Sequence, residues 1–226
     1  MWVVAESELM PSYSLATLQG LVYDSLDNNT GLYPVLQVTD ALNNAVRKTN
    51  FLTGIIEATI PAITQAGQLV YSTPTGILVP MRIYCEGVEL GKYSMRELGA
   101  QFRTWATDTT TALGPVARWC PIGIGSFVLH PVDAAGGKLL EVNGVAPITP
   151  MVNSGDTVDL DDEFVPILVD YCRARLLLKL GGKPFASASA AYQRFMRGLK
   201  DAVIWEGMVF PRYWIESEEE PTEGKA

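Results

Sequence analysis

The stretch that decides the fold reads DDEFVPILVDYCRARLLLKLGG and covers residues 161–182. Its apolar side chains recur every three or four residues, which is the spacing of one face of an α-helix. Three carboxylates precede Phe164 and favour the positive end of that helix, while Gly181-Gly182 ends it. The sequence therefore predicts a helix over 164–180, and its buried stripe is Phe164, Ile167, Leu168, Tyr171, Cys172 and Leu176.

Three further segments on either side of this helix show the same periodicity. Residues 187–204 carry an inward stripe at Tyr192, Phe195, Met196, Leu199 and Val203. Near the start of the chain, residues 14–26 and 39–53 form two more amphipathic helices, and Ser14 is placed to cap the first. Neither terminal pair of helices can bury its stripes alone, so we expect the two pairs to pack together as one bundle.

The middle of the chain has a different period. Apolar and polar residues alternate from Ile56 to Ile60, and later apolar runs are bounded by Gly or Pro, as in short strands. Ser94 and Glu97 match a capping box that opens one embedded helix, and Asn143-Gly144 predicts a hairpin or tight turn. We therefore predict an α+β fold, a helical bundle with a β-rich middle insertion that projects from it. Its parts are 1–53 with 155–207 (bundle), 54–154 (β-rich, with a helix near 94–105) and 208–226 (C-terminal tail).

Composition narrows the class of protein. The formal charge is -8, and the end of the chain, 216–226, holds five glutamates and one lysine. Without a Lys/Arg-rich run we expect only non-specific passage of DNA, and we expect no membrane association. The start lacks the basic region of a secretory signal, and Cys85, Cys120 and Cys172 form no CxxC pair. We expect three buried thiols in a protein made in a reducing host cytoplasm.

The residues that could carry chemistry do not form a site. His130 is the only histidine and has no Gly-x-Ser-x-Gly partner motif. Gly-Gly-Lys at 136–138 and 181–183 lacks the phosphate-loop spacing, and the carboxylates of 156–163 lack the glycine of a calcium loop. We expect those carboxylates to stabilise a helix start. The sequence thus predicts no enzyme, no catalytic residue, no cofactor and no metal.

The segment 205–215 follows the last predicted helix and is too apolar for a free chain end. It contains Phe210, Tyr213, Trp214 and Ile215. Exposed aromatic clusters usually mark a contact surface. The segment could equally pack onto its own domain, and its residue composition does not distinguish this possibility from a contact surface.

Two groups of motifs together resemble the head-to-tail adaptor, or head-completion, proteins of tailed bacteriophages, including the tail-tube gatekeeper type. The first group precedes the second along the chain, in the order strand pair, acidic turn and two long helices. The motifs are ARWCPIG (117–123), FVLHP (127–131) and LLEV (139–142), then VDLDDEF (158–164), LVDY (168–171), GG (181–182) and YQRF (192–195).

This resemblance implies a structural virion protein of the head–tail neck. Proteins of the class form a ring, typically a dodecamer, below the portal protein, and they connect it to a tail or nozzle protein and continue the DNA channel. Their C-terminal tail docks on the portal or on a neighbouring subunit, which makes Phe210, Tyr213, Trp214 and Ile215 the candidate contacts. The alternative function is a β-rich receptor- or sugar-binding decoration or tail module, which would need an exposed aromatic platform on its sheet.

Overall fold

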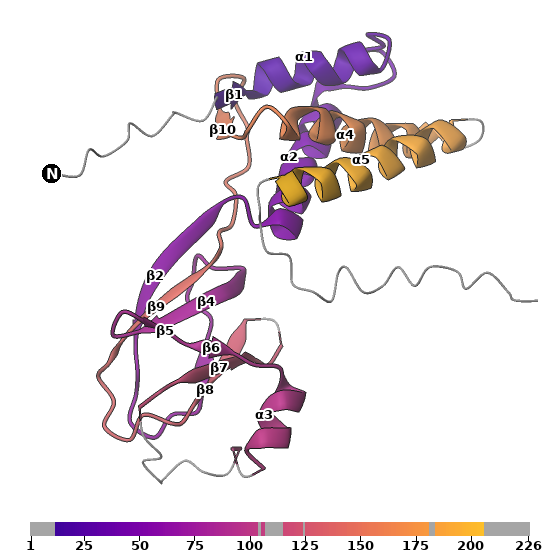
Figure 1. Cartoon of the computed structure of the whole chain (residues 1–226). Helices are drawn as coiled ribbons and strands as arrows, with labels where there is room; N and C mark the ends of the chain where they lie inside the picture. The colour runs from indigo at the N-terminus through magenta and orange to yellow at the C-terminus, as the bar shows by residue number, and fades with distance from the viewer. Residues whose placement is uncertain (1–11, 104, 107–114, 124, 181–183, 206–226) are drawn as a thin grey trace, which may run out of the picture. The chain divides into compact units, whose positions relative to one another are not determined.

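The computed structural model describes residues 12–103, 105–106, 115–123, 125–180 and 184–205 (Figure 1). The chain divides into two compact units. The first, here the helical unit, takes Met1–Thr53 and Thr149–Ala226, and the second, here the β unit, takes Gly54–Ile148. Both helices and sheets are present, so the prediction of a mixed α+β protein is confirmed.

Four helices make up most of the described helical unit. The helix α4 contacts each of the other three, and Figure 1 shows α4 and α5 side by side. The buried side of α4 includes Phe164, Leu168 and Cys172, and Phe195 of α5 is fully buried as well. These helices are α1 (Leu15–Ser25), α2 (Val35–Thr53), α4 (Phe164–Leu180) and α5 (Phe185–Trp205).

The start of α1 is fixed by its cap and by a short strand pair. The Ser14 side chain accepts a hydrogen bond from the backbone N–H of Thr17 at 3.2 Å, as its position in the sequence predicts. Strand β1 (Ser12–Ser14) pairs antiparallel with β10 (Thr157–Asp159). This pairing ties the beginning of the chain to the segment that leads into α4.

Helix α2 begins at Val35, four residues before the predicted start at residue 39. The reason is Pro34, whose carbonyl accepts hydrogen bonds from the backbone N–H groups of Gln37 and Val38. Proline fits the first turn of a helix because the N–H that it lacks has no partner there. The earlier start places Val35 and Leu36 on the helix, where they are 56% and 83% exposed.

The described β unit consists of two four-stranded sheets and one short helix, α3 (Met95–Gln101). The sheet orders are β2-β9-β4-β5 and β3-β8-β7-β6, and all neighbours are antiparallel except β6 and β7. The strands are β2 (Glu57–Ile63), β3 (Val70–Ser72), β4 (Val79–Cys85), β5 (Val88–Glu89), β6 (Gly91–Lys92), β7 (Arg118–Pro121), β8 (Ser126–His130) and β9 (Leu139–Val145).

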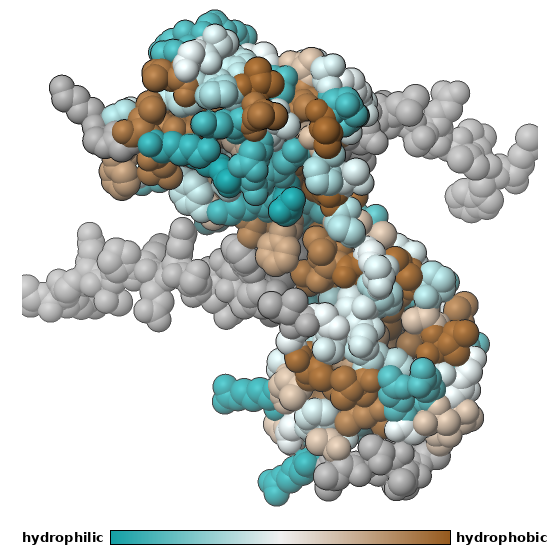
Figure 2. Space-filling model, turned by 180° about the vertical axis from the view of Figure 1, so that it is seen from behind, coloured by the Kyte–Doolittle hydropathy of each residue, from teal (hydrophilic) through white to brown (hydrophobic). Residues whose placement is uncertain are grey.

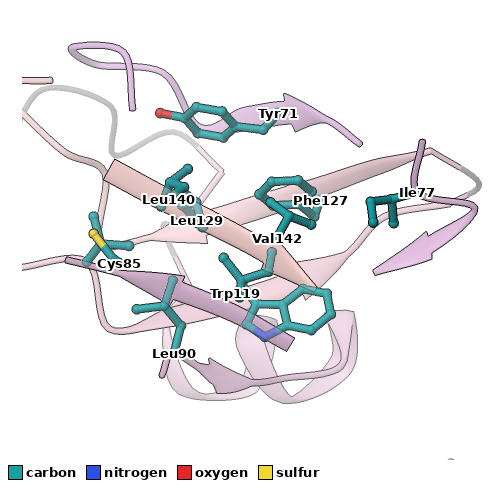
Figure 3. Packing of buried hydrophobic residues seen from close by; sticks show 11 residues of the cluster. Tyr71, Ile77, Cys85, Leu90, Trp119, Phe127, Leu129, Leu140 and Val142 are labelled. Atoms are coloured by element: carbon teal, nitrogen blue, oxygen red, sulfur yellow. The ribbon is translucent and has the colours of Figure 1, made fainter. Parts of the chain in front are cut away.

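Side chains from both sheets meet in one apolar core (Figure 3). Trp119 and Phe127 pack edge to face with ring centroids 6.4 Å apart, and Tyr71 stacks on Phe127 at 5.7 Å. These three rings come from one sheet, whereas Leu140 and Val142 come from β9 of the other. The alternating apolar residues of these strands therefore point toward a shared interior.

The predicted turn at Asn143-Gly144 is wrong, because both residues lie inside the central strand β9. Gly144 pairs with Ala58 on one side and with Pro80 on the other. A Cβ atom at residue 144 would lie 2.2 Å from the carbonyl oxygen of Val79. The glycine is thus needed for close backbone approach where the register of β4 shifts, rather than for a turn.

The capping box at Ser94 is confirmed, but the helix that it opens is shorter than predicted. The Ser94 hydroxyl accepts from the Glu97 N–H, and the Glu97 carboxylate accepts from the Ser94 N–H. Helix α3 ends at Gln101, before the predicted limit near 105. Phe102 has left the helical conformation, and its ring packs against His130 at a centroid distance of 4.7 Å.

Candidate assembly surface

The four predicted contact residues, Phe210, Tyr213, Trp214 and Ile215, lie outside the described residues, so their role stays a prediction. Any surface that binds them must offer apolar area. Brown, hydrophobic side chains reach the surface of the helical unit in Figure 2, beside teal hydrophilic ones. Two pockets on this unit combine exposed apolar and polar side chains.

The first, here the apolar pocket, has a volume of about 390 Å³. It lies where the starts of α1 and α2 meet the segment after residue 150. Its rim includes Leu36, Val152 and Val35, which are 83%, 75% and 56% exposed. Large apolar side chains this exposed, gathered at one place, are typical of a contact surface. The lining residues are Leu15, Gln19, Val35, Leu36, Thr39, Asp40, Asn43, Met151, Val152 and Ser154.

Hydrogen bonds hold the walls of the apolar pocket in place. The Asn43 side chain donates to the backbone carbonyl of Met151 at 2.9 Å and accepts from the Met151 N–H at the same distance. The Gln19 amide donates to the Thr39 hydroxyl at 2.8 Å and so links α1 to α2. The pocket is therefore preformed, which lowers the entropy lost when a partner binds.

The segment that forms the far wall is shaped by Asp156. Its carboxylate accepts hydrogen bonds from the backbone N–H groups of Val152 and Asn153 at 2.7 and 2.8 Å. These two bonds lower the pKa of the Asp156 carboxyl below its usual value. The Asp156 carboxylate thus holds a turn and keeps Val152 at the rim, rather than stabilising the helix start that the sequence predicted for it.

The second pocket, here the cationic pocket, has a volume of about 130 Å³ and lies among α2, α4 and α5. The Lys48 ammonium donates to the Tyr192 hydroxyl at 2.9 Å and lies 5.0 Å from the centre of that ring. It also lies over the rings of Tyr171 and Phe195, at 5.4 and 5.8 Å. The lining residues are Lys48, Tyr171, Ala174, Arg175, Leu178 and Tyr192.

The prediction that Tyr192 belongs to a buried core stripe is wrong, because Tyr192 is 39% exposed. Met196, from the same predicted stripe, is 38% exposed and so was also predicted wrongly, whereas Phe195 is fully buried. Tyr192 and Phe195 are three residues apart on α5, and this spacing does not tell which of the two side chains is the more buried. The contact of Tyr192 with Lys48 of α2 shows that Tyr192 lies at the edge of the helix packing. Sequence reasoning therefore missed this pocket, since its residues come from helices far apart in the chain.

An ion pair connects the two pockets. Asp40 lines the apolar pocket and Arg175 lines the cationic pocket, and the two side chains are 3.0 Å apart. Both are substantially exposed, so the pair contributes about 0.2–1 kcal/mol to stability at most. Its importance is positional, because it shows that the two pockets are neighbours on one surface that runs along α2.

The α4 and α5 helices carry an excess of positive charge in a chain of formal charge -8. Arg194 forms a bidentate contact with Asp170, in which Nη2 donates to Oδ1 at 2.6 Å and Nε donates to Oδ2 at 3.1 Å. The excess favours an acidic partner segment. The charged residues of the two helices are Arg173, Arg175, Lys179, Arg194, Arg197 and Lys200, against Asp170 and Asp201.

The cysteines and the histidine that the sequence offered for chemistry are buried in the packed interior. Cys85, Cys120 and Cys172 are free and buried, as predicted, and burial raises the pKa of the Cys172 thiol far above its usual value. His130 is buried beside the Phe102 ring. Within the described ranges, no group of three or more His, Cys, Asp or Glu side chains is placed to hold a metal ion. The helices described there include none that is both long and apolar enough to cross a membrane.

Comparison with known proteins identifies the family. No curated protein matches the chain. A family model described as "SU10 adaptor protein" matches residues 13–211, which include all the described elements from α1 to α5. The match therefore covers most of the chain and both units, and it agrees with the predicted resemblance to phage head-to-tail adaptors. The chain belongs to the SU10 adaptor protein family and is a bacteriophage adaptor protein.

Proposed function

We propose that the protein forms a ring below the portal of a tailed phage, connects the capsid to the tail and continues the DNA channel. The family match over residues 13–211 carries this proposal. The partners are the portal protein on one side and a tail or nozzle protein on the other. The ring contains twelve copies in the virion neck, after synthesis in the host cytoplasm.

A ring requires that each copy offer two different surfaces, one for each neighbour. The helical unit offers one such surface, because its apolar and cationic pockets lie next to each other on exposed helices. We assign the ring contacts to this unit, as a bundle formed by the N- and C-terminal helix pairs. The C-terminal tail, with Phe210, Tyr213, Trp214 and Ile215, supplies the complementary contact to the portal or to the neighbouring subunit.

DNA passes through the ring without specific binding, in this proposal. The chain has a formal charge of -8 and lacks a Lys/Arg-rich run of the kind that binds phosphates tightly. Two of the arginines on α4 and α5, Arg175 and Arg194, are engaged with Asp40 and Asp170. The role is structural and involves no catalysis, cofactor or metal.

The alternative function, a receptor- or sugar-binding module, has less support. Such a module needs exposed aromatic rings on its sheet. Of the aromatic side chains on its strands, Tyr71, Trp119 and Phe127 are buried between the sheets, and Tyr84 is half-buried.

The test is binding to the portal protein of the same phage. Purified portal rings are mixed with the full-length chain, and the complex is separated by sedimentation and weighed by native mass spectrometry. We expect twelve copies of the chain on each portal ring. Recovery of the portal without the chain, over a range of salt concentrations, would contradict the proposed function.

A further inference from the structure

We propose that the N-terminal segment, residues 1–11, folds back over the apolar pocket of the same copy and covers it with Trp2, Val3 and Val4. These residues lie outside the described part of the chain. The pocket itself, the place where the described chain begins and the composition of the segment together point to this contact. It needs neither a ring nor a portal, so it is a property of the isolated chain.

The apolar pocket favours an uncharged, apolar occupant. Its three rim side chains are each more than half exposed, and such a cluster is stabilised when another apolar surface covers it. Among its lining residues Asp40 alone is charged, and that carboxylate is already paired with Arg175. The amides of Gln19 and Asn43 are bonded within the pocket walls. The pocket therefore offers apolar area and no free charge to an occupant.

The first residues of the chain are an occupant of this kind. Residues 1–5 read MWVVA and carry no charged side chain. A single buried aromatic side chain such as Trp2 removes about 150–250 Å² from water. Glu6 and Glu8 follow directly, and their carboxylates suit a solvated connection between this apolar head and β1.

The described chain begins at the edge of the pocket. Strand β1 starts at Ser12, and α1 follows at Leu15, which lines the pocket. The Ala16 N–H donates to the carbonyl of Ser154, another lining residue, at 3.1 Å, and Figure 1 shows β1 and β10 beside the start of α1. A tether this short holds the apolar head near the pocket at an effective concentration on the order of millimolar. Weak intrinsic affinity is therefore enough to keep the pocket covered.

The lengths of pocket and segment agree. Helix α2 lines the pocket from Val35 to Asn43, and these eight residues correspond to about 12 Å along the helix axis. Residues 2–5 span about 13 Å when extended, so the apolar head covers this length. The six residues that remain, 6–11, reach up to about 20 Å, which returns the chain from the pocket to Ser12.

A covered pocket makes assembly on this surface conditional. A partner that uses the apolar pocket must first displace the segment, so its apparent affinity falls by the fraction of copies that are uncovered. Until then the rim is kept out of water, which lowers the tendency of free copies to associate through it.

The first test is a disulfide inside one copy. Val3→Cys leaves Trp2 in place and is combined with Val152→Cys at the pocket rim, where the native side chain is 75% exposed. The matched control combines Val3→Cys with Phe185→Cys, at a position that is 63% exposed on the helical unit but lies outside both pockets. The native cysteines are buried and do not compete.

The link is identified by mass spectrometry. Dilute full-length protein is oxidised, its remaining thiols are blocked, and it is unfolded and digested with trypsin. The first Lys or Arg of the chain is Arg47, and residue 152 lies between Lys138 and Arg173. The expected disulfide therefore joins two different tryptic peptides, 1–47 and 139–173.

We expect about fivefold or more linkage at residue 152 than at residue 185, because a disulfide requires Cα atoms within about 7 Å of each other. The yield should not depend on protein concentration, since the two cysteines belong to one copy. Equal linkage at the two positions, or none at either, would overturn the proposal. Linkage between copies that rises with concentration would assign the pocket to the segment of another copy and would also overturn it.

A second test removes the apolar head without cysteines. One variant carries serine at the three apolar positions (Trp2→Ser, Val3→Ser, Val4→Ser), and its matched control carries serine at the two acidic ones (Glu6→Ser, Glu8→Ser). Both are full-length, and far-UV circular dichroism checks that they fold. The readout is the fluorescence of Nile red, a neutral dye that brightens on apolar surfaces.

We expect the triple variant to bind about twofold or more dye than the unsubstituted chain, and the control to bind the same amount as that chain. Addition of Leu36→Asp at the rim should reverse the increase, because it places a charge on the uncovered pocket. Unchanged dye binding in the triple variant, or an increase that Leu36→Asp does not reverse, would contradict a covered pocket. Loss of folding in the triple variant would place the segment in the core, which would contradict a removable cover.

Discussion

The substitution Gly144→Ala tests the packing of the β unit, since Gly144 lies in the central strand β9. The added Cβ would meet the Val79 carbonyl oxygen at 2.2 Å and the Pro80 Cα at 2.9 Å. Neither atom belongs to a flexible side chain, so a rotamer change cannot relieve the contact. Overpacking of this kind typically costs about 1–3 kcal/mol and sometimes more. We expect a cost of about 3 kcal/mol, the upper end of that range, because two strands must separate.

The assay is urea unfolding followed by the fluorescence of the tryptophans, with Trp119 in the affected core. The matched control is Gly155→Ala, where no heavy atom lies within 4 Å of the new Cβ and the backbone is not left-handed. We expect the control to change the free energy of unfolding by less than about 0.5 kcal/mol. Equal stability of the two variants would refute the position of Gly144 between β2 and β4.

Four further predictions concern the core, acid stability, the tail and assembly. Leu168→Ala or Phe195→Ala should each lower the free energy of unfolding by about 2–5 kcal/mol, as both side chains are fully buried; an unchanged melting temperature would show that the helix stripes are assigned wrongly. Burial alone would raise the pKa of Asp133, but hydrogen bonds from Thr64 and two backbone N–H groups, with Lys138 nearby, lower it on balance. The stability that this carboxylate contributes is present above its ordinary pKa of 3.8 and is lost as the pH falls through the lower folded value. Asp133→Asn should therefore destabilise the protein at neutral pH and flatten its unfolding curve below about pH 4, and an acid profile identical to that of the unsubstituted chain would contradict this. Truncation after residue 207 should spare folding, as circular dichroism would show, yet abolish attachment to the portal and leave particles that leak DNA or lack tails; a truncated chain that does not fold would place the segment in the core. The isolated chain should be mainly monomeric by light scattering, and a stable dodecamer without portal would refute assembly on a portal template.

Local signals in the sequence located the four long helices and two helix caps, but not the start of α2 or the end of α3. The α4 stripe, the Ser14 cap and the Ser94 capping box each depend on residues three or four positions apart. The structure confirms them, apart from Tyr171 of the stripe, which is only half-buried. Asn143-Gly144 shows the limit of such signals. An Asn-Gly dipeptide occurs both in turns and where two strands approach closely. Here the close approach is to the backbone of Val79, which is more than sixty residues away in the sequence.

The candidate surface could not be predicted from local patterns, because it depends on long-range contacts. The apolar pocket exists because Asn43 binds Met151, and the cationic pocket exists because Lys48 lies over Tyr192. The early start of α2, which exposes Leu36, results from Pro34, whose carbonyl accepts the first hydrogen bonds of the helix.

The most direct test of the proposed assembly is a cryo-electron microscopy map of the portal with the chain bound. We expect a ring of twelve copies below the portal. A map in which the chain is absent from the neck, or decorates the capsid or a tail fibre instead, would contradict the adaptor function.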